Sequence, residues 1–201
     1  MERENKVSIP LHRPGLRESF FFFLSGIISS VPFTLLTEQF ADGLVVTLQL
    51  QLFYAILISA VLVAPFLEEF AKAFPLFYRH GETERSVFGL GFLVGLGFGI
   101  FEFVTYVFLL GAPVLLRLPG VLFHAASTSI MAYGIATKRT VTFYLIAVGL
   151  HFSNNFAALL HFTMDNSALL GPWSAVSLFA SVATYVLSWH LYLKTSDRIV
   201  Q

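Results

Sequence analysis

Residues 86–110 read SVFGLGFLVGLGFGIFEFVTYVFLL, and this stretch decides the fold class. It is long and apolar enough to cross a bilayer, since a spanning helix needs about 20 mostly apolar residues. It nevertheless contains a carboxylate, Glu102. A charge near the bilayer centre costs roughly 2.5–3.5 kcal/mol on insertion scales. We therefore expect a membrane helix whose glutamate faces other protein groups rather than lipid.

The composition of the whole chain agrees with that of a membrane protein. Of its 201 residues, 56% are hydrophobic and only 12% are charged, whereas soluble domains carry about 25% charged residues. The net charge is zero, so nothing in the charge balance favours a nucleic-acid partner. The chain has no cysteine, which excludes disulfides, thiol catalysis and cysteine-based metal sites.

Hydropathy predicts an all-α fold, a bundle of about six transmembrane helices. The expected spans are 19–38, 44–66, 86–110, 114–136, 140–162 and 168–193. The second span is expected to continue past Pro65 as a helix to about residue 78. Short loops predict antiparallel neighbours. We expect an N-terminal tail at 1–18, one transmembrane domain at 19–193 and a C-terminal tail at 194–201. No signal-peptide cleavage pattern follows the N-terminal tail.

Basic residues predict the orientation of the bundle. With these spans, eleven of the twelve fall on one side, and Arg117 is alone on the other. The eleven are Arg3, Lys6, Arg13, Arg17, Lys72, Arg79, Arg85, Lys138, Arg139, Lys194 and Arg198. Because basic residues are enriched in cytoplasmic loops, we expect a multi-pass protein of the cell membrane with both termini in the cytoplasm.

The first polar motif is APFLEEFAK at residues 64–72. On a helix, Lys72 lies one turn from both Glu68 and Glu69. A paired carboxylate beside a lysine suits a general base. The alternative is a helix end at the membrane surface with all three groups in water. Counting from the predicted span ends places Glu102 about 24 Å deep but the glutamate pair near the surface. A later start of the second span, or a kink at Pro65, would remove this conflict.

Three further motifs place polar groups inside predicted spans. Glycines at 91, 95 and 99 form one stripe for close helix packing, with Gly97 beside it and Glu102 near the same face. In FHAAST, His124 and Thr128 share a helix face, and in LHFSNN, His151 and Asn155 do the same. A single histidine in such a helix is more often structural, but two facing three glutamates favour a functional site.

We expect six side chains to converge on one cavity as catalytic groups, namely Glu68, Glu69, Glu102, His124, His151 and Asn155, with Lys72 and Thr128 in support. Such groups can activate water directly, with Glu as the base and His or Asn as oxyanion donors. Alternatively, His124, His151, Glu68 and Glu102 form an adequate zinc set. The prediction is that no cofactor is needed, with zinc as the alternative. No G-x-S-x-G, H-E-x-x-H or P-loop motif competes.

Taken in order, the four motifs resemble the PrsW family of intramembrane proteases. That family is grouped with the CAAX prenyl endopeptidases and their bacterial relatives in a glutamic-type superfamily. The resemblance covers about residues 64–156. It comprises P-x-x-E-E-x-x-K at 65–72, G-F-x-x-x-E at 97–102, His124 with Thr128, and His151 with Asn155. Two positions depart from the family pattern: Phe103 stands where Asn is common, and Ser86 where Asp is frequent.

The resemblance implies an intramembrane endopeptidase that cleaves a membrane-associated protein or peptide. The Glu68/Glu69 pair would activate the attacking water, and His151 with Asn155 would stabilise the oxyanion. Two alternatives remain from the sequence. One is a non-catalytic scaffold of the same superfamily, and the other is a small proton-coupled transporter, since buried Glu and His also form proton relays. Oligomeric state and substrate identity do not follow from the motifs.

Overall fold

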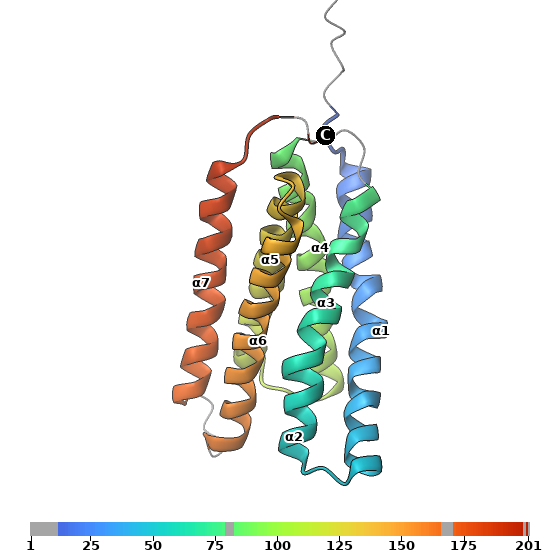
Figure 1. The fold of residues 1–201 in the computed structure, drawn as a ribbon, viewed down its shortest axis with the longest axis vertical. Helices are drawn as coiled ribbons and strands as arrows, with labels where there is room; N and C mark the ends of the chain where they lie inside the picture. The colour runs from blue at the N-terminus through green and yellow to red at the C-terminus, as the bar shows by residue number, and fades with distance from the viewer. Residues whose placement is uncertain (1–11, 79–82, 166–170, 199, 201) are drawn as a thin grey trace, which may run out of the picture.

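The computed structural model describes residues 12–78, 83–165, 171–198 and 200. Figure 1 shows long helices running up and down beside one another in one bundle. Their bounds are α1 Leu16–Leu48, α2 Leu52–Ile56, η1 Leu57–Val63, α3 Ala64–Ala73, η2 Phe74–Tyr78, α4 Glu84–Val104, η3 Thr105–Leu109, α5 Val114–Ala136, α6 Thr140–Met164 and α7 Pro172–Lys194. Here η1 and η3 are π-helical and η2 is a 3₁₀ helix.

The expected fold class, an all-α polytopic membrane protein, is confirmed. Within the described residues, five helices are long and apolar enough to cross a membrane. They are Leu52–Tyr78, Glu84–Leu109, Val114–Ala136, Thr140–Met164 and Pro172–Lys194. Helix α1, with 33 residues, runs alongside them and packs against α3 and α4.

The predicted boundary between the first two spans is wrong. A loop was expected at 39–43, but α1 continues to Leu48, and the break falls at Gln49–Gln51. Gln49 ends the helix in the left-handed conformation, with φ of 51°. Consequently the second span begins at Leu52, so Glu68 and Glu69 lie well inside it rather than at its cytoplasmic end. This late start removes the conflict in depth with Glu102.

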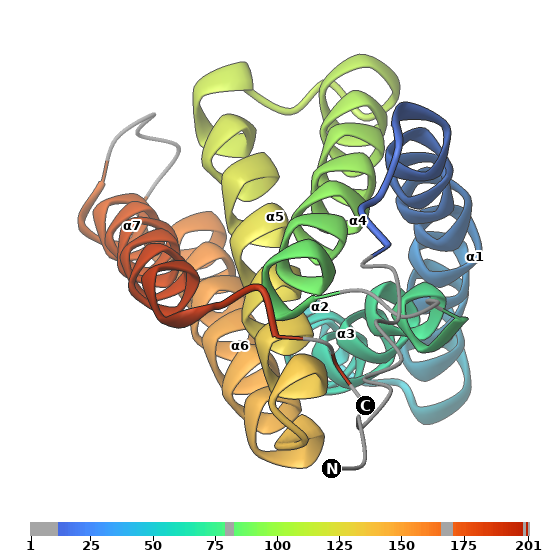
Figure 2. The ribbon, with the colours of Figure 1, turned by 90° about the horizontal axis from the view of Figure 1, so that it is seen from above.

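Helix α5 lies at the centre of the bundle. Seen from above, α4 separates it from α1, while α6 and α7 cover its other side (Figure 2). It contacts α3, α4, α6 and α7. Its residues from Phe123 to Met131 are all buried. A polar group on this segment therefore meets protein rather than lipid, which is the environment that His124 requires.

Close packing of α4 on α5 depends on the glycine stripe. A Cβ atom at Gly95 would overlap the backbone carbonyl of His124 and would crowd the Thr128 hydroxyl. Gly97 points the other way and faces the backbone of Phe23 on α1. The stripe thus acts in packing, as its spacing predicts. It brings the backbone of α4 close enough for Glu102 to reach His124.

The start of α1 and the C-terminal end of α7 lie at the same end of the bundle, together with the α5–α6 turn (Figure 1). The C-terminal segment is fastened there, because the Glu84 carboxylate accepts bonds from the Ser196 N–H and hydroxyl, and Arg85 donates to the Thr195 carbonyl. One member of the predicted basic set is misplaced. Lys72 is fully buried in the bundle, so it does not contribute to the charge of a cytoplasmic loop.

We predict that the end of the bundle where α1 begins and α7 ends is cytoplasmic. The basic residues at the start of α1, the start of α4, the α5–α6 turn and the end of α7 lie there, namely Arg17, Arg85, Lys138, Arg139 and Lys194. Reporter fusions at residue 1, within 137–140 and at residue 201 should all report the cytoplasm. An outside report from any of the three fusions would contradict this topology.

We predict that Gly95→Ala destabilises the protein by about 1–3 kcal/mol, the usual cost of overpacking a tight contact. The added methyl group meets the α5 backbone, which cannot move aside as a side chain can. Thermal unfolding in detergent would measure the effect. Gly89→Ala is the matched control, since nothing lies within 4 Å of a Cβ at this position of the same helix. Equal stability of the two variants would refute the close-packing role.

Candidate active site

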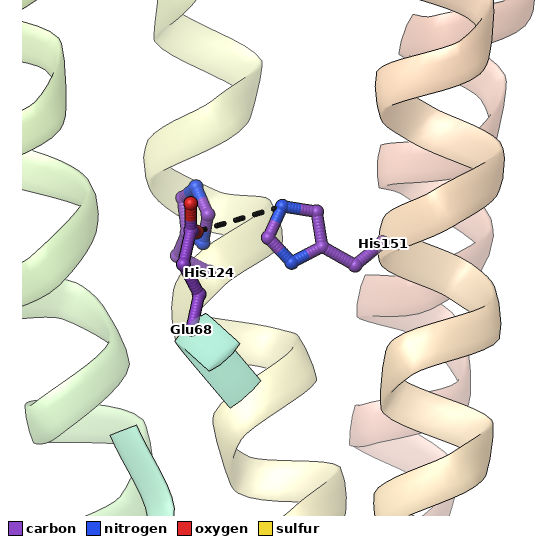
Figure 3. Close-up of side chains that lie close together, drawn as sticks. All are labelled: Glu68, His124 and His151. Carbon is purple, nitrogen blue, oxygen red and sulfur yellow. Dashed lines mark ion pairs between the residues drawn. The ribbon is translucent and has the colours of Figure 1, made fainter. Parts of the chain in front are cut away.

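Five predicted site residues meet in the interior of the bundle. Glu68 and Glu69 come from α3, Glu102 from the end of α4, His124 from α5 and His151 from α6. The rings of the two histidines lie edge to face, with centroids 5.2 Å apart. Figure 3 shows Glu68, His124 and His151 pointing toward one another from three helices. The alternative of a solvated helix end is therefore wrong for this motif.

Lys72 organises the inner side of the cluster. Its ammonium group donates to Glu69 Oε1 at 2.6 Å and to His124 Nδ1 at 3.0 Å. It also lies over the ring of Phe98, 4.9 Å from the ring centroid. The side chain is fully buried, so these contacts replace its hydration. A lone buried charge would be strongly destabilising, which ties Lys72 to Glu69.

Glu69 is held by three donors that converge on one oxygen. Oε1 accepts from Lys72 Nζ, from Ser127 Oγ at 3.2 Å and from His151 Nδ1 at 2.8 Å. Its side chain is fully buried. With this oxygen so occupied, the geometry favours a positioning role for Glu69. It links α3 to α5 and α6 and sets the orientation of the His151 ring.

The contacts of His124 determine where its ring proton lies. An ammonium group has donors and no acceptor, so Nδ1 must accept the bond from Lys72. The proton of the neutral ring is then on Nε2, which is in contact with a Glu102 carboxylate oxygen. Lys72, His124 and Glu102 thus form a continuous chain of hydrogen bonds. It runs from the buried interior to Glu102, whose side chain is 22% exposed.

His151 and Glu68 face each other across a gap. Because Nδ1 of His151 bonds to the Glu69 carboxylate, it carries the ring proton, and Nε2 presents a lone pair. That lone pair lies 3.7 Å from Glu68 Oε2 (dashed line in Figure 3), which has no hydrogen-bond partner among the described residues. Two buried acceptors this close need a donor or a cation between them.

Asn155 has a different immediate partner from the other predicted residues. Its Nδ2 donates to the Ala60 carbonyl at 2.9 Å. In η1 the Ala64 N–H bonds to Ser59, and the next donor in this π-helical pattern would be Pro65, which has no N–H. Asn155 therefore satisfies a carbonyl that the backbone leaves free. It also lines the cavity described below, and its amide group has a second N–H.

The other supporting residues divide between two tasks. Thr128 bonds to the carbonyl of His124 on its own helix and does not reach the carboxylates through any described bond. Ser127, which sequence reasoning treated only as a small residue, donates to Glu69. Its position one turn after His124 was the available signal, since residues three apart share a helix face.

A small cavity of about 60 Å³, partly open to the surroundings, adjoins the cluster. Glu102 and His124 line its inner part, and Asn154 and Asn155 of α6 form one wall. Tyr106 and Arg117, which the sequence analysis left without a site role, also line it. The cavity therefore reaches the Glu102–His124 side of the cluster, whereas Glu68, Glu69 and His151 do not line it.

The donor set also matches a divalent metal. One ligand atom each from Glu68, His124 and His151 lies within 4.8 Å of the others, and zinc favours imidazole nitrogen and carboxylate oxygen. The Glu69 carboxylate on the far nitrogen of His151 is the support typical of a metal-bound histidine. Both nitrogens of His124 already have protein partners, so ligation by His124 would displace Lys72 or Glu102.

Comparison with family models decides the relationship. The model described as PrsW family intramembrane metalloprotease matches residues 15–191. The chain belongs to this family. The match confirms the resemblance found in the four motifs and extends it to helices that carry none of them. Comparisons with curated proteins and with solved structures found no match.

Membership in the PrsW family supports a protease of the membrane at the family level. The family description names a metalloprotease, whereas the motifs placed the chain in a glutamic-type superfamily. The two chemistries use the same buried side chains, so the difference concerns what fills the gap between Glu68 and His151.

Proposed function

We propose that the protein is an intramembrane endopeptidase that hydrolyses a peptide bond of a membrane-associated protein through water activated by Glu68. One observation carries the proposal, the buried gap between Glu68 Oε2 and His151 Nε2. Because both atoms accept hydrogen bonds, a water molecule between them can donate one O–H to each. Such a water has its lone pairs free for attack on a carbonyl carbon.

Glu68 is the general base in this proposal. As the water oxygen bonds to the carbonyl carbon, its proton passes to the Glu68 carboxylate, and the carbonyl oxygen takes the negative charge. Burial of Glu68, whose side chain is 11% exposed, keeps competing water away from it. Glu69 contributes by orienting His151, not by touching the substrate. The adjacent glutamates therefore have separate tasks.

His124 and Glu102 present a polarised N–H group beside the cavity in this proposal. The Nε2 proton of His124 and the Glu102 oxygen share a contact at the inner part of the cavity. The proton that Glu68 took from the water passes to the leaving amine as the carbon–nitrogen bond breaks and the carbonyl re-forms, which restores the Glu68 carboxylate. Lys72 holds His124 in the required tautomer throughout.

Asn155 is the proposed oxyanion donor. One N–H is used by the Ala60 carbonyl, and the second is available on the cavity side. The resemblance assigns the same role to His151. In this structure Nδ1 of His151 is engaged with Glu69, so we assign His151 to holding the water.

A metal-assisted form would use Glu68, His124 and His151 as ligands. When bound, a divalent ion such as zinc lowers the pKa of its water and polarises the carbonyl. Either form leaves Glu69 as the group that fixes His151. The substrates implied by the family are membrane proteins or peptides reached within the bilayer, and the proposed location is the cell membrane.

We predict that Glu68→Gln lowers the cleavage rate by about 10²–10⁴-fold, the usual loss for a general base, while folded protein accumulates normally. Gln keeps the size and an acceptor but cannot take up the proton. Purified protein in liposomes would be assayed on membrane peptides, with products identified by mass spectrometry. Glu18→Gln, which alters a surface pair with His12, is the control.

Glu69→Gln provides the contrast within the same motif. It leaves Lys72 without its carboxylate, so the expected defect is a loss of about 3–5 kcal/mol of stability, seen in thermal unfolding. A scaffold protein would tolerate Glu68→Gln. Wild-type cleavage by the Glu68 variant, alone or combined with Glu69→Gln, would refute the proposed chemistry.

We predict that turnover survives removal of metal ions, because Glu68 can act as the base and both nitrogens of His124 are already bonded. Protein would be treated with a strong chelator, its metal content measured by mass spectrometry and its activity followed. One zinc per chain, with activity lost on chelation and restored by zinc, would establish the metal-assisted form instead.

A further inference from the structure

The outer part of the cavity carries a positive charge that the proposed chemistry does not use. Arg117 lies in the first turn of α5, at the end of the bundle opposite to α7's C-terminus. It lines the same cavity as Glu102 and His124, together with Tyr106 and Leu116. It is also the basic residue that sequence analysis found alone on its side of the membrane.

The guanidinium of Arg117 is held by an aromatic ring, and the negative charge that it senses within the site is that of Glu102, which it does not contact. It lies over the Tyr106 ring, 3.7 Å from the ring centroid, in a cation–π contact. It pairs with no carboxylate in the described part of the chain. A fixed, half-buried arginine with free donors is suited to binding a carboxylate, because its planar fork matches that group.

The distance of Arg117 from the site follows from the geometry of α5, the helix that carries both Arg117 and His124. Arg117 and His124 are two helical turns apart, so they share a face at an axial distance of about 10.5 Å. An extended substrate advances about 3.3–3.6 Å per residue. A group bound at Arg117 is therefore about three residues from a bond cleaved beside His124.

The charged residues of the cavity favour one orientation of a bound substrate. Glu102, His124 and Arg117 all line the cavity, and Arg117 lies two turns nearer to the end of the bundle than His124. An acidic group on the substrate is repelled by the inner carboxylates and attracted by the outer guanidinium. Both effects favour the same register, with the acidic group at Arg117 and an uncharged segment at the site.

We propose that Arg117 is a specificity-determining residue, which binds an acidic side chain of the substrate about three residues from the cleaved bond. This inference rests on the proposed function. The substrate class is a membrane-associated segment whose apolar residues enter the site and whose Asp or Glu stays near the membrane surface opposite to the termini.

The test uses the full-length protein in phosphatidylcholine liposomes. Synthetic apolar peptides carry a single Asp, Asn or Lys at successive positions, and mass spectrometry maps each cleaved bond. Wild type is compared with Arg117→Glu and with Arg139→Glu. Arg139 is the matched control, since it also lies over an aromatic ring, that of Phe143, but at the other end of the bundle. Glu68→Gln is the inactive reference.

Wild type should cleave best when Asp lies about three residues from the cleaved bond. The kcat/KM for that peptide should be roughly tenfold higher than for the peptide with Asn at the same position, because KM is lower. Arg117→Glu should lose this preference and favour Lys at the same position, while Arg139→Glu behaves as wild type. The loss of kcat/KM in Arg117→Glu should be larger for peptides with Asp at this position than for peptides without a charge, since only the former lose an ion pair.

Two results would overturn the inference while leaving the proposed function intact. One is Glu68-dependent cleavage with no positional preference for Asp in wild type. The other is an Arg117→Glu defect that is equal for all peptides, which would assign Arg117 to a structural role. If no peptide is cleaved in a Glu68-dependent manner, the proposed function fails and the inference with it.

Discussion

The site depends on one buried ion pair, between Lys72 and Glu69 of α3. Neither side chain is exposed, and an ammonium group inside a membrane bundle is tolerated only with a close counter-charge. The pair spans a single helical turn, so α3 brings its own compensation. Lys72 then fixes the tautomer of His124, and Glu69 fixes that of His151. Both histidines are oriented before any substrate arrives.

Backbone features carry these side chains to a common depth. The glycine stripe lets α4 approach α5, so that Glu102 reaches His124. The π-helical η1 and Pro65 precede the glutamates, and Asn155 caps the Ala60 carbonyl that they leave free. A residue expected only as an oxyanion donor thus also joins α6 to the segment that presents Glu68 and Glu69.

Two adjacent glutamates have different surroundings because consecutive helical residues point about 100° apart. Glu69 turns inward and receives three donors on one oxygen, whereas Glu68 turns toward the gap beside His151. Oε2 of each glutamate lacks a hydrogen-bond partner among the described residues, which is costly for a buried group, but it is Oε2 of Glu68 that lies 3.7 Å from His151 Nε2. Such a cost is common where a protein keeps a group ready for a ligand, water or proton. The arrangement suits a reactive carboxylate beside a structural one.

The sequence by itself determined the membrane class, most helix bounds, the family and which polar residues share the interior. Hydropathy, glycine spacing and four motifs are local patterns, and a bilayer makes them decisive because isolated charges in lipid are so costly. Local patterns failed at the end of α1, where helix continued through the polar residues 37–42, and at Lys72, which was counted with a loop.

Only the tertiary structure decided how the polar residues divide their tasks. Contacts between different helices give Glu68 and Glu69 their separate surroundings and set the tautomers of both histidines. They also give Asn155 its capping role and bring Ser127, Tyr106 and Arg117 to the site. Those contacts join residues many positions apart, such as Glu69 and His151. Spacing along one helix shows which side chains share a face, but the neighbour that each one meets is set by how the helices pack.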